Sequence, residues 1–563
     1  MKVLWILSLG LLAIVASVAQ AQTTCGARVR KDWDAMTATE KTTYKNAIAA
    51  AMDSGAYIKF VEMHTEMKSE MEAHNQCMFV YWHRLLLVVF ENMLRGQGAA
   101  YACVTVPYFN WIVAAARVTA GTCNSFGSCM AITRELGGWK GTQRTLAING
   151  INNSGRCVAV SPLDHFCQLT SITGTACVKC IPRSDWSAAR VPTAAGYASV
   201  RNQVLGGKTI GQMSPLVEKG CHNNVHANLG STMGTFASPA DPLFWSHHAM
   251  VDALHSIFHK CRVGTAILTT AQKTASAGWT SCARRDTGTF NPTDAITMRT
   301  GEKGVNPIPG RTDPKIGKYF TGVPTQFVGL MDTRDLGTSS YTYAFSGQLA
   351  TLYSQCDAAP TTRKLEEMME STETNGTSKC SVTQDEESGS NGNYLNIIAL
   401  DNTGKQIDAD TPTEAYITDE DEKRVIDWYD QTMEAMGRDS HENMADLERQ
   451  ACMFEHVCLG GTKDYSPEFK ALWKVKEPRC KTIVDAIVNG SESIIYESWR
   501  ENMEAQFGCP DPTDSTNSTS YSGSWGSSGD GTVAYSVMVG SQESVEDSND
   551  TINYPEPAFD TAW

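Results

Sequence analysis

Beyond its first 21 residues the chain has no long apolar run, and it carries no excess of positive charge. No later apolar segment is long enough to cross a bilayer, so an integral membrane protein is not expected. Lysine and arginine number 47 against 62 aspartates and glutamates, and the net charge of −15 argues against nucleic acid or an anionic membrane as a partner. Histidine is scarce, with 12 in 563 residues, and no internal repeat of useful length is present.

The first 21 residues have the features of a secretory signal. Lys2 precedes an apolar run over residues 4–18, and the small residues of AQA at 19–21 form a cleavage site before Gln22. All 18 cysteines lie after this segment, which fits disulfide formation in an oxidising compartment. Five Asn-x-Ser/Thr sequons agree with export, at Asn152, Asn375, Asn489, Asn517 and Asn549. We therefore expect a secreted, extracellular glycoprotein.

Shifts in composition divide the rest of the chain. Residues 22–360 are rich in aromatics, glycine and apolar runs and hold ten of the twelve histidines, so they form the expected catalytic domain. Residues 361–412 are polar and acidic, as in a linker, and residues 510–563 have the Ser, Gly and Asp content of a disordered tail. Residues 413–509 combine helical patterning with four cysteines and predict a small disulfide-braced helical module. These cysteines are Cys452, Cys458, Cys480 and Cys509.

Three histidines cluster within residues 57–95. Phe60, His64, Met67 and Met71 recur at helical spacing, which predicts a helix over residues 57–72 with His64 facing the core. His83 shares a stripe with apolar residues on a second helix. His74 precedes His83 by nine residues and would face the opposite side of one continuous helix, so we expect a break between them.

A second group of histidines begins at residue 222. His222 and His226 are four residues apart, a spacing that suits a shared metal ion, and FWSHHAMVD then adds His247 and His248 on a further helix. Asp252 follows one turn later and is expected to brace this helix or to support a ligand. The pair His255 and His259 has the same spacing but lies ~10 Å or more along the helix axis, so it is not expected to bind that metal.

The composition of these two groups narrows the choice of metal. Neither contains a carboxylate or thiolate at matching positions, which favours a borderline metal with redox chemistry over calcium or magnesium. Zinc is the alternative. A structural zinc site would more often recruit cysteine, and HNNVH has no glutamate to serve as the general base of a hydrolytic site. The CVKC spacing of Cys177 and Cys180 is interpreted as structural.

Five motifs in order resemble the tyrosinase group of type 3 copper proteins. They are HNQCMFVYWHRLLLVVFENML with its H-x8-H spacing, VPYFNW at 106–111, HNNVH, DPLFWSHHAMVD, and YTY at 341–343. The resemblance covers roughly residues 50–350. It implies a mainly α fold in which a four-helix bundle holds two copper ions. It also implies O2 as co-substrate, with hydroxylation of monophenols and oxidation of o-diphenols to o-quinones.

The resemblance also implies roles for individual residues. The copper A ligands would be His64, His74 and His83, and the copper B ligands would be His222, His226 and His248, with His247 as a neighbour. Glu218 and Asn223 match the pair that holds a deprotonating water, Phe236 matches a residue that overhangs copper A, and Ala227 stands at the substrate entrance. Ala253 and His255 depart from the Arg and Trp common in the family. No cysteine matches the thioether of some relatives, and Cys77 is expected in a disulfide or as a buried thiol.

Three functions are compatible with these motifs. The favoured one is a secreted tyrosinase or catechol oxidase that crosslinks or pigments extracellular material and acts on phenolic small molecules or on tyrosine or DOPA residues of proteins. A haemocyanin-like oxygen-binding protein and an inactive matrix protein are the alternatives. We also expect that the module after residue 413 either covers the site entrance as a lid or serves as an anchoring appendage.

Overall fold

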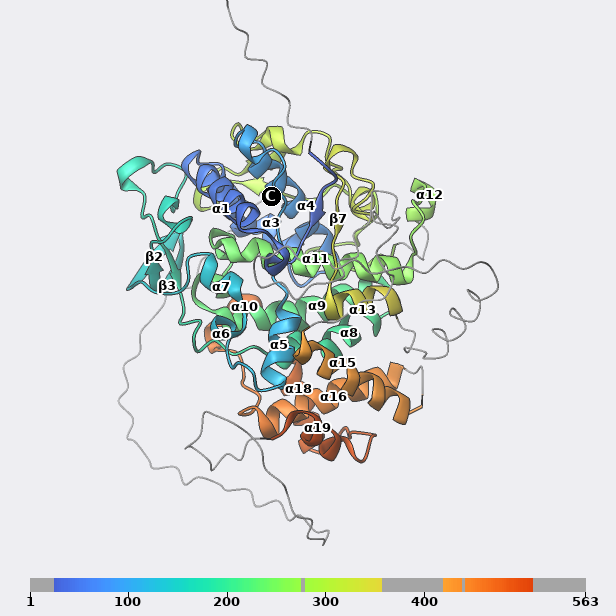
Figure 1. Ribbon diagram of the computed structural model, residues 1–563. Coiled ribbons are helices and arrows are strands. Elements are labelled where there is room, and N and C mark those ends of the chain that lie inside the picture. The colour runs from blue at the N-terminus through green and yellow to red at the C-terminus, as the bar shows by residue number, and fades with distance from the viewer. Residues whose placement is uncertain (1–24, 275–278, 357–418, 438–440, 510–563) are drawn as a thin grey trace, which may run out of the picture. The chain divides into compact units, whose positions relative to one another are not determined.

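Helices make up most of the regular structure, as predicted. The computed structural model describes residues 25–274, 279–356, 419–437 and 441–509, all of which belong to one compact unit (Figure 1). The expected signal, the acidic linker, the C-terminal tail and the sequons at Asn375, Asn517 and Asn549 lie outside these residues. The other two sequon asparagines, Asn152 and Asn489, are exposed. No helix in the described part of the chain is long and apolar enough to cross a membrane.

Eighteen α-helices are described. They are α1 (Ala38–Asp53), α2 (Tyr57–Thr65), α3 (Met67–Ala73), α4 (Phe79–Arg95), α5 (Trp111–Thr119), α6 (Phe126–Cys129), α7 (Ala131–Glu135), α8 (Tyr197–Leu205), α9 (Ile210–Val217), α10 (Asn223–Leu229), α11 (Pro242–Arg262), α12 (Thr270–Lys273), α13 (Gly347–Gln355), α15 (Glu420–Ala435), α16 (His441–Cys458), α17 (Pro467–Trp473), α18 (Arg479–Val488) and α19 (Trp499–Phe507).

The described strands are short and lie outside the helical core. A hairpin of β2 (Thr142–Ile148) and β3 (Ile151–Val158) turns at Asn149 and Gly150, both with positive φ, and β4 (Ile181–Arg183) extends it. β1 (Val29–Arg30) pairs in parallel with β7 (Thr342–Tyr343), and β5 (Arg299–Thr300) pairs with β6 (Ile308–Pro309). The β1–β7 pair brings the first described residues onto the YTY segment.

Four helices, α2, α4, α10 and α11, surround the histidines. Aromatic side chains pack three of them together: Phe90 on α4 stacks on Trp245 of α11 at 3.5 Å between ring centroids, and Phe60 on α2 contacts both rings. These rings are fully buried. These three rings, called here the aromatic floor, therefore form a buried apolar layer next to the helical turns that carry the histidines.

The predicted single helix over residues 57–72 is wrong at Glu66. The helix ends at Thr65, and Glu66 adopts an extended conformation in which its carboxylate accepts a hydrogen bond from Ser69 N–H at 2.9 Å and caps α3. Met67 consequently points outward with 66% of its surface exposed, although helical spacing placed it on the core face. His64 lies before the break and is buried as predicted.

A buried ion network ties α4 to α11. The Asp252 carboxylate of α11 accepts hydrogen bonds from Arg84 Nε of α4 at 2.6 Å and from Arg30 Nη1 at 3.2 Å. The hydroxyls of Tyr341 and Tyr343 donate to the same carboxylate, each at 2.6 Å. Burial by itself would raise the pKa of Asp252, but the charges of Arg84 and Arg30 outweigh it and lower that pKa. Asp252 thus braces α11, one of the two roles predicted.

Eight disulfides reinforce the described residues. Six lie before residue 357 and two lie within the C-terminal segment: Cys25–Cys103, Cys77–Cys282, Cys123–Cys129, Cys157–Cys180, Cys167–Cys177, Cys261–Cys356, Cys452–Cys480 and Cys458–Cys509. Cys177 and Cys180 pair with different partners, so the CxxC spacing is structural, as interpreted. Cys77 is in a disulfide, and the four cysteines after residue 450 form two bridges.

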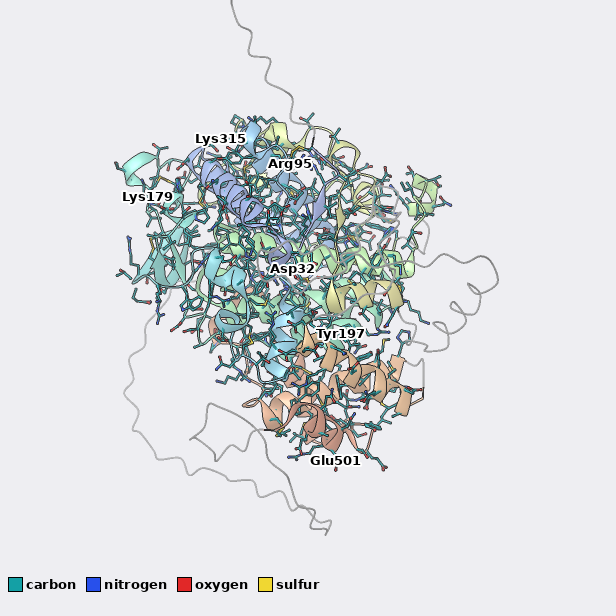
Figure 2. All side chains as sticks on the ribbon, viewed as in Figure 1. Asp32, Arg95, Lys179, Tyr197, Lys315 and Glu501 are labelled. Atoms are coloured by element: carbon teal, nitrogen blue, oxygen red, sulfur yellow. A yellow bond between two sulfur atoms is a disulfide. The ribbon has the colours of Figure 1, made fainter. Side chains whose placement is uncertain are left out.

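Helices α15–α19, called here the C-terminal module, pack against α5, α8 and α13. Tyr197 on α8, which is labelled in Figure 2, contacts Tyr429 on α15 edge-on at 5.2 Å between ring centroids. Glu448 on α16 accepts a hydrogen bond from Asn202 Nδ2 of α8 at 2.6 Å and pairs with Arg479 of α18. The module therefore docks through buried aromatic and polar contacts rather than resting loosely on the surface.

One of these contacts buries a carboxyl group. Glu422 on α15 is 2% exposed and accepts a hydrogen bond from Gln348 N–H at 3.1 Å, next to Gly347. Gly347 has a φ of +52°, and a Cβ there would collide with the Glu422 carboxyl, so glycine is required on both grounds. Burial, followed by the nearby charges of Asp419 and Asp32, raises the pKa of Glu422 to about 8.

This pKa predicts that docking of α15 depends on pH. Glu422 keeps its proton up to about pH 8 in the folded chain, whereas its ordinary pKa is 4.5. The protonated group therefore stabilises the folded chain fully below pH 4.5, and this stabilisation is lost as the pH rises through about 8. Glu422→Gln keeps the acceptor for Gln348 and cannot ionise. We expect it to raise the midpoint of thermal unfolding above pH 8 and to leave the midpoint unchanged below pH 4.5. Glu420→Gln, exposed on the same helix, is the control, and equal shifts at both pH values would contradict the prediction.

Candidate metal centre

The structure brings the predicted histidines together in two buried clusters. One cluster consists of His64, His74 and His83, and the other consists of His222, His226, His247 and His248; within each, potential ligand atoms lie within 4.8 Å of one another. The clusters adjoin, because the rings of His83 and His248 stack at 4.3 Å between centroids. All seven side chains are at most 2% exposed. In the part of the chain that the structure describes, His255 and His259 lie outside the groups that could hold a metal ion.

The first cluster is built by two helices and the break between them. His64 lies on α2 and His83 on the second turn of α4. His74 follows the end of α3 in an extended conformation, so the predicted interruption before His83 is confirmed. Arg285 holds this segment by donating to the His74 carbonyl at 3.1 Å and by pairing with Glu70 at 3.1 Å.

The second cluster depends on an irregular turn. Residues Glu218–His222 form a π-type turn before α10, and the backbone leaves helical geometry at Gly220. Gln203 on α8 packs where a Cβ of Gly220 would lie and accepts a hydrogen bond from Cys221 N–H at 2.8 Å. This contact fixes the position of His222, whose ring lies 4.5 Å from that of His226 between centroids. The predicted pairing of these two histidines on one face is confirmed.

Hydrogen bonds at Nδ1 set the tautomers of four of the histidines. His64 donates to Phe236 O at 2.7 Å, His83 to Phe79 O at 2.9 Å, and His226 to Met233 O at 2.6 Å. His222 donates to the Asn223 side-chain oxygen at 2.9 Å. Because each Nδ1 carries the proton, each Nε2 presents its lone pair, the form of imidazole that binds a metal ion.

The Nε2 atoms converge on the interior and lack protein partners. Those of His64, His74, His83 and His222 are buried without a hydrogen-bond partner among the described residues. His226 Nε2 and His248 Nε2 face each other at 3.4 Å. Uncompensated burial of a polar atom is costly, so an orphaned set of imidazole nitrogens fits a site that is completed by metal ions.

His247 differs from the other histidines of its cluster in tautomer. Trp111 Nε1 donates a hydrogen bond to His247 Nδ1 at 3.2 Å, so that nitrogen is an acceptor and the proton of the neutral ring lies on Nε2. A protonated Nε2 cannot bind a metal. The contact therefore selects His248 from the adjacent pair, in agreement with the resemblance-based assignment.

This difference predicts unequal effects of substitution at the two neighbours. His248→Ala should remove one copper ion per chain because it deletes a lone pair that faces the centre. His247→Gln should retain full copper content because its amide can still accept the hydrogen bond from Trp111. Copper would be measured by elemental analysis after metal loading, and a loss in His247→Gln equal to that in His248→Ala would contradict the assignment.

Burial keeps these rings neutral. It lowers the pKa of His64 to about 4 and that of His226 to about 3. Burial followed by neighbouring histidines lowers the pKa of His74 and His83 well below the ordinary value. Neutral imidazole is the form that binds a metal ion, so these histidines do not have to lose a proton when a metal binds.

Glu218 and Asn223 both lie beside the histidines but make different contacts. One carboxylate oxygen of Glu218 accepts a hydrogen bond from Asn75 N–H at 2.6 Å, and the other is buried without a partner among the described residues. Burial raises the pKa of Glu218 to about 8. The Asn223 oxygen orients His222, as described above. Each residue thus has a supporting contact within the site.

Phe236 and Ala227 meet the C-terminal module at the mouth of the site. The Phe236 ring stacks on His74 at 5.3 Å between centroids, and it also contacts Trp473 of α17 at 5.0 Å. Ala227 packs against the cluster formed by Tyr465, Phe469 and Trp473, called here the plug. Trp473 is 1% exposed, and its ring lies 5.2 Å from His74 and 5.1 Å from His226. The plug therefore covers both clusters.

Sequence patterns did not identify Trp473 as part of the site. The only signal in the sequence is the expectation that the module after residue 413 covers the site entrance as a lid. The YSPEFKALW stretch has aromatics at positions 465, 469 and 473, which is the spacing of one apolar helical face. Such a stripe does not reveal which distant surface it covers.

Known proteins resemble the part of the chain that carries the histidines. A sequence model described as the common central domain of tyrosinase matches residues 54–260. A tyrosinase of Streptomyces glaucescens is 29% identical over 262 residues, covering 43% of this chain and 86% of the relative. Tyrosinase P of Aspergillus terreus is 25% identical over 301 residues, covering 44% and 82%.

Solved structures in the comparison include a polyphenol oxidase from Thermothelomyces thermophila, with 18% identity, a TM-score of 0.36 and coverage of 57% of this chain and 89% of that one. Deoxygenated hemocyanin from Rapana thomasiana has 14% identity, a TM-score of 0.37 and coverage of 62% and 75%. The matched central domain contains the histidines of both clusters. Through this domain the chain is similar to the tyrosinase family of type 3 copper proteins.

Proposed function

We propose that the protein is a secreted dicopper oxidoreductase that uses O2 to hydroxylate monophenols such as tyrosine and to oxidise o-diphenols to o-quinones. The products would crosslink or pigment extracellular material. The substrates would be phenolic small molecules or tyrosine and DOPA residues of extracellular proteins. The single observation that carries the proposal is the set of buried Nε2 atoms in two adjoining histidine clusters, which lack protein hydrogen-bond partners or face each other.

The ligands would be His64, His74 and His83 for one copper and His222, His226 and His248 for the other. Copper bound there would supply reversible one-electron chemistry at two adjacent centres, which O2 reduction requires. The protein itself orients the ligand rings and keeps water out of the site. The carbonyls of Phe236, Phe79 and Met233 hold ligand rings in orientation, and the plug and aromatic floor exclude water.

Removal of a ligand tests the proposal directly. His83→Ala and His226→Ala should each lower the copper content of the purified chain by at least one ion while the disulfides remain intact. His165→Ala is the matched control, because this histidine is partly exposed and pairs with Asp53 at 2.8 Å, away from both clusters. Full copper content in both ligand variants would refute the assignment.

Hydroxylation of monophenols needs a further group, since a phenol has a pKa of about 10 and must lose its proton near neutral pH. Glu218, with its unpartnered buried oxygen, and Asn223 are the proposed holders of a deprotonating water. Glu218→Gln should therefore depress monophenol turnover by ~10² or more and catechol turnover much less. Equal losses on the two substrates, measured as quinone formation, would assign Glu218 a purely structural role.

The covered site favours one alternative to the oxidase, an oxygen-binding protein. An oxygen-binding protein of the haemocyanin kind needs the copper pair but must keep phenols out, and the plug covers both histidine clusters. An experiment that removes the plug from the site distinguishes the two candidate functions. Quinone formation from catechol after release supports the oxidase, whereas reversible O2 binding without turnover supports the carrier.

A further inference from the structure

Trp473 makes polar contacts at both ends as well as covering the histidines. Its indole N–H donates to Gly234 O at 2.9 Å, and its main-chain carbonyl accepts a hydrogen bond from the Asn75 side-chain amide at 3.1 Å. Between these two points the ring packs against His74, His226 and Phe236. An aromatic residue of a polypeptide is thus bound at the metal centre by its ring and by its backbone.

Asn75 is held in position for the second contact. Its backbone has a φ of +54°, which is uncommon for residues other than glycine. The conformation is maintained because Asn75 N–H donates to the Glu218 carboxylate at 2.6 Å, while the side-chain amide donates to the Trp473 carbonyl. Backbone strain of this kind persists only where surrounding contacts enforce it. The backbone of Asn75 is therefore held by a contact that does not involve Trp473.

The Trp473 carbonyl that Asn75 binds takes no part in the hydrogen bonds within its helix. Trp473 is the last residue of α17, and the final carbonyls of a helix have no partner within it. Tryptophan and tyrosine both attach their rings to the main chain through one methylene group. A tyrosine residue of another chain, with its carbonyl on Asn75, would consequently place its ring in the space now filled by the indole.

We propose that Asn75, which here binds the main-chain carbonyl of Trp473, is a specificity-determining residue that recognises the main-chain carbonyl of a tyrosyl or DOPA residue. This inference rests on the proposed oxidase function and selects among its substrates. Phenols within a polypeptide, or with an acyl group at the same position, gain a hydrogen bond that simple phenols lack. A net hydrogen bond of this kind corresponds to a preference of ~3- to 10-fold.

The experiment uses the full chain with a specific protease site inserted at residue 361, cleaved once and kept with both pieces together. We compare kcat/KM for N-acetyl-L-tyrosinamide with kcat/KM for 4-methylphenol. The plug competes with both substrates alike, so the ratio of the two values isolates the carbonyl contact. Asn75→Gly tolerates the left-handed backbone and removes the amide, and Asn75→Asp keeps the shape but cannot donate.

Both variants should lower the ratio ~3- to 10-fold. Asn228→Ala, which removes an amide that donates only to Asn224 O, should leave it unchanged. Binding of the same two ligands to the metal-free cleaved chain, measured by calorimetry, should show the same loss of preference. An unchanged ratio, or an equal loss on both phenols, overturns the role of Asn75. If the copper-loaded parent oxidises neither phenol, the proposed function fails, and the metal-free binding assay still decides the inference.

Discussion

Trp473→Gly in the full, copper-loaded chain should raise the rate of catechol oxidation by ~10² or more, because loss of a buried tryptophan side chain costs ~3–5 kcal/mol of packing and each 1.4 kcal/mol is a factor of ten. That packing free energy now holds the ring over the histidines, where it is 1% exposed. Without the indole, small diphenols reach the site while α17 stays docked. Quinone formation, followed by absorbance, measures the effect.

A matched tryptophan controls for general loosening of the module. Trp499 lies on α19, is partly buried and makes none of the ring contacts to histidine that Trp473 makes. Trp499→Gly should leave turnover close to that of the parent chain. If Trp473→Gly binds normal copper and shows unchanged catechol turnover, the plug does not limit access, and the module is an anchoring appendage.

Asp252→Ala should lower the free energy of unfolding by ~3–5 kcal/mol, the cost of leaving buried cations without their counter-charge. The carboxylate holds Arg84, Arg30 and two tyrosine hydroxyls in a fully buried network. Since Arg84 follows His83 and Asp252 lies one turn after His248, the loss should also disturb the spacing of the two clusters. Urea unfolding and copper content measure these two consequences.

Two further variants check the mechanism of this destabilisation. Asp252→Asn keeps one acceptor oxygen but replaces the other with an amide donor and removes the charge, so its stability should lie between that of the parent chain and that of Asp252→Ala. Asp53→Ala removes a carboxylate that is paired only at the surface, with His165, and should change stability by no more than about 0.5 kcal/mol. A loss below about 1 kcal/mol in Asp252→Ala would show that the network is not a major source of stability.

The sequence indicated the metal centre more completely than the helices that build it. Helical spacing identified His64 and His83 as inward-facing, and the nine-residue interval to His74 required the break that the structure contains. The same spacing wrongly extended the first helix through Glu66. A glutamate serves equally well inside a helix and, as here, as the cap of a new one, so periodicity alone does not locate that boundary.

Contacts between distant segments were beyond such patterns. The hydrogen bond from Trp111 that distinguishes His247 from His248 joins residues 136 positions apart. The Asn75–Trp473 contact spans 398 positions. Its donor depends on a left-handed backbone, which an asparagine allows but does not require. Family resemblance supplied the roles of the six histidines, but it did not predict which side chain would cover them.

The disulfides of the C-terminal module affect what a single cut in the chain would do. In the described residues both of its bridges are internal, and none joins the module to the catalytic domain. While the chain is intact, the plug acts at an effective concentration set by its covalent connection to the rest of the chain, whatever the amount of protein. After one cut, occupancy of the site becomes a bimolecular equilibrium. Dilution alone would then open the site, so activity per molecule should rise as the cleaved protein is diluted.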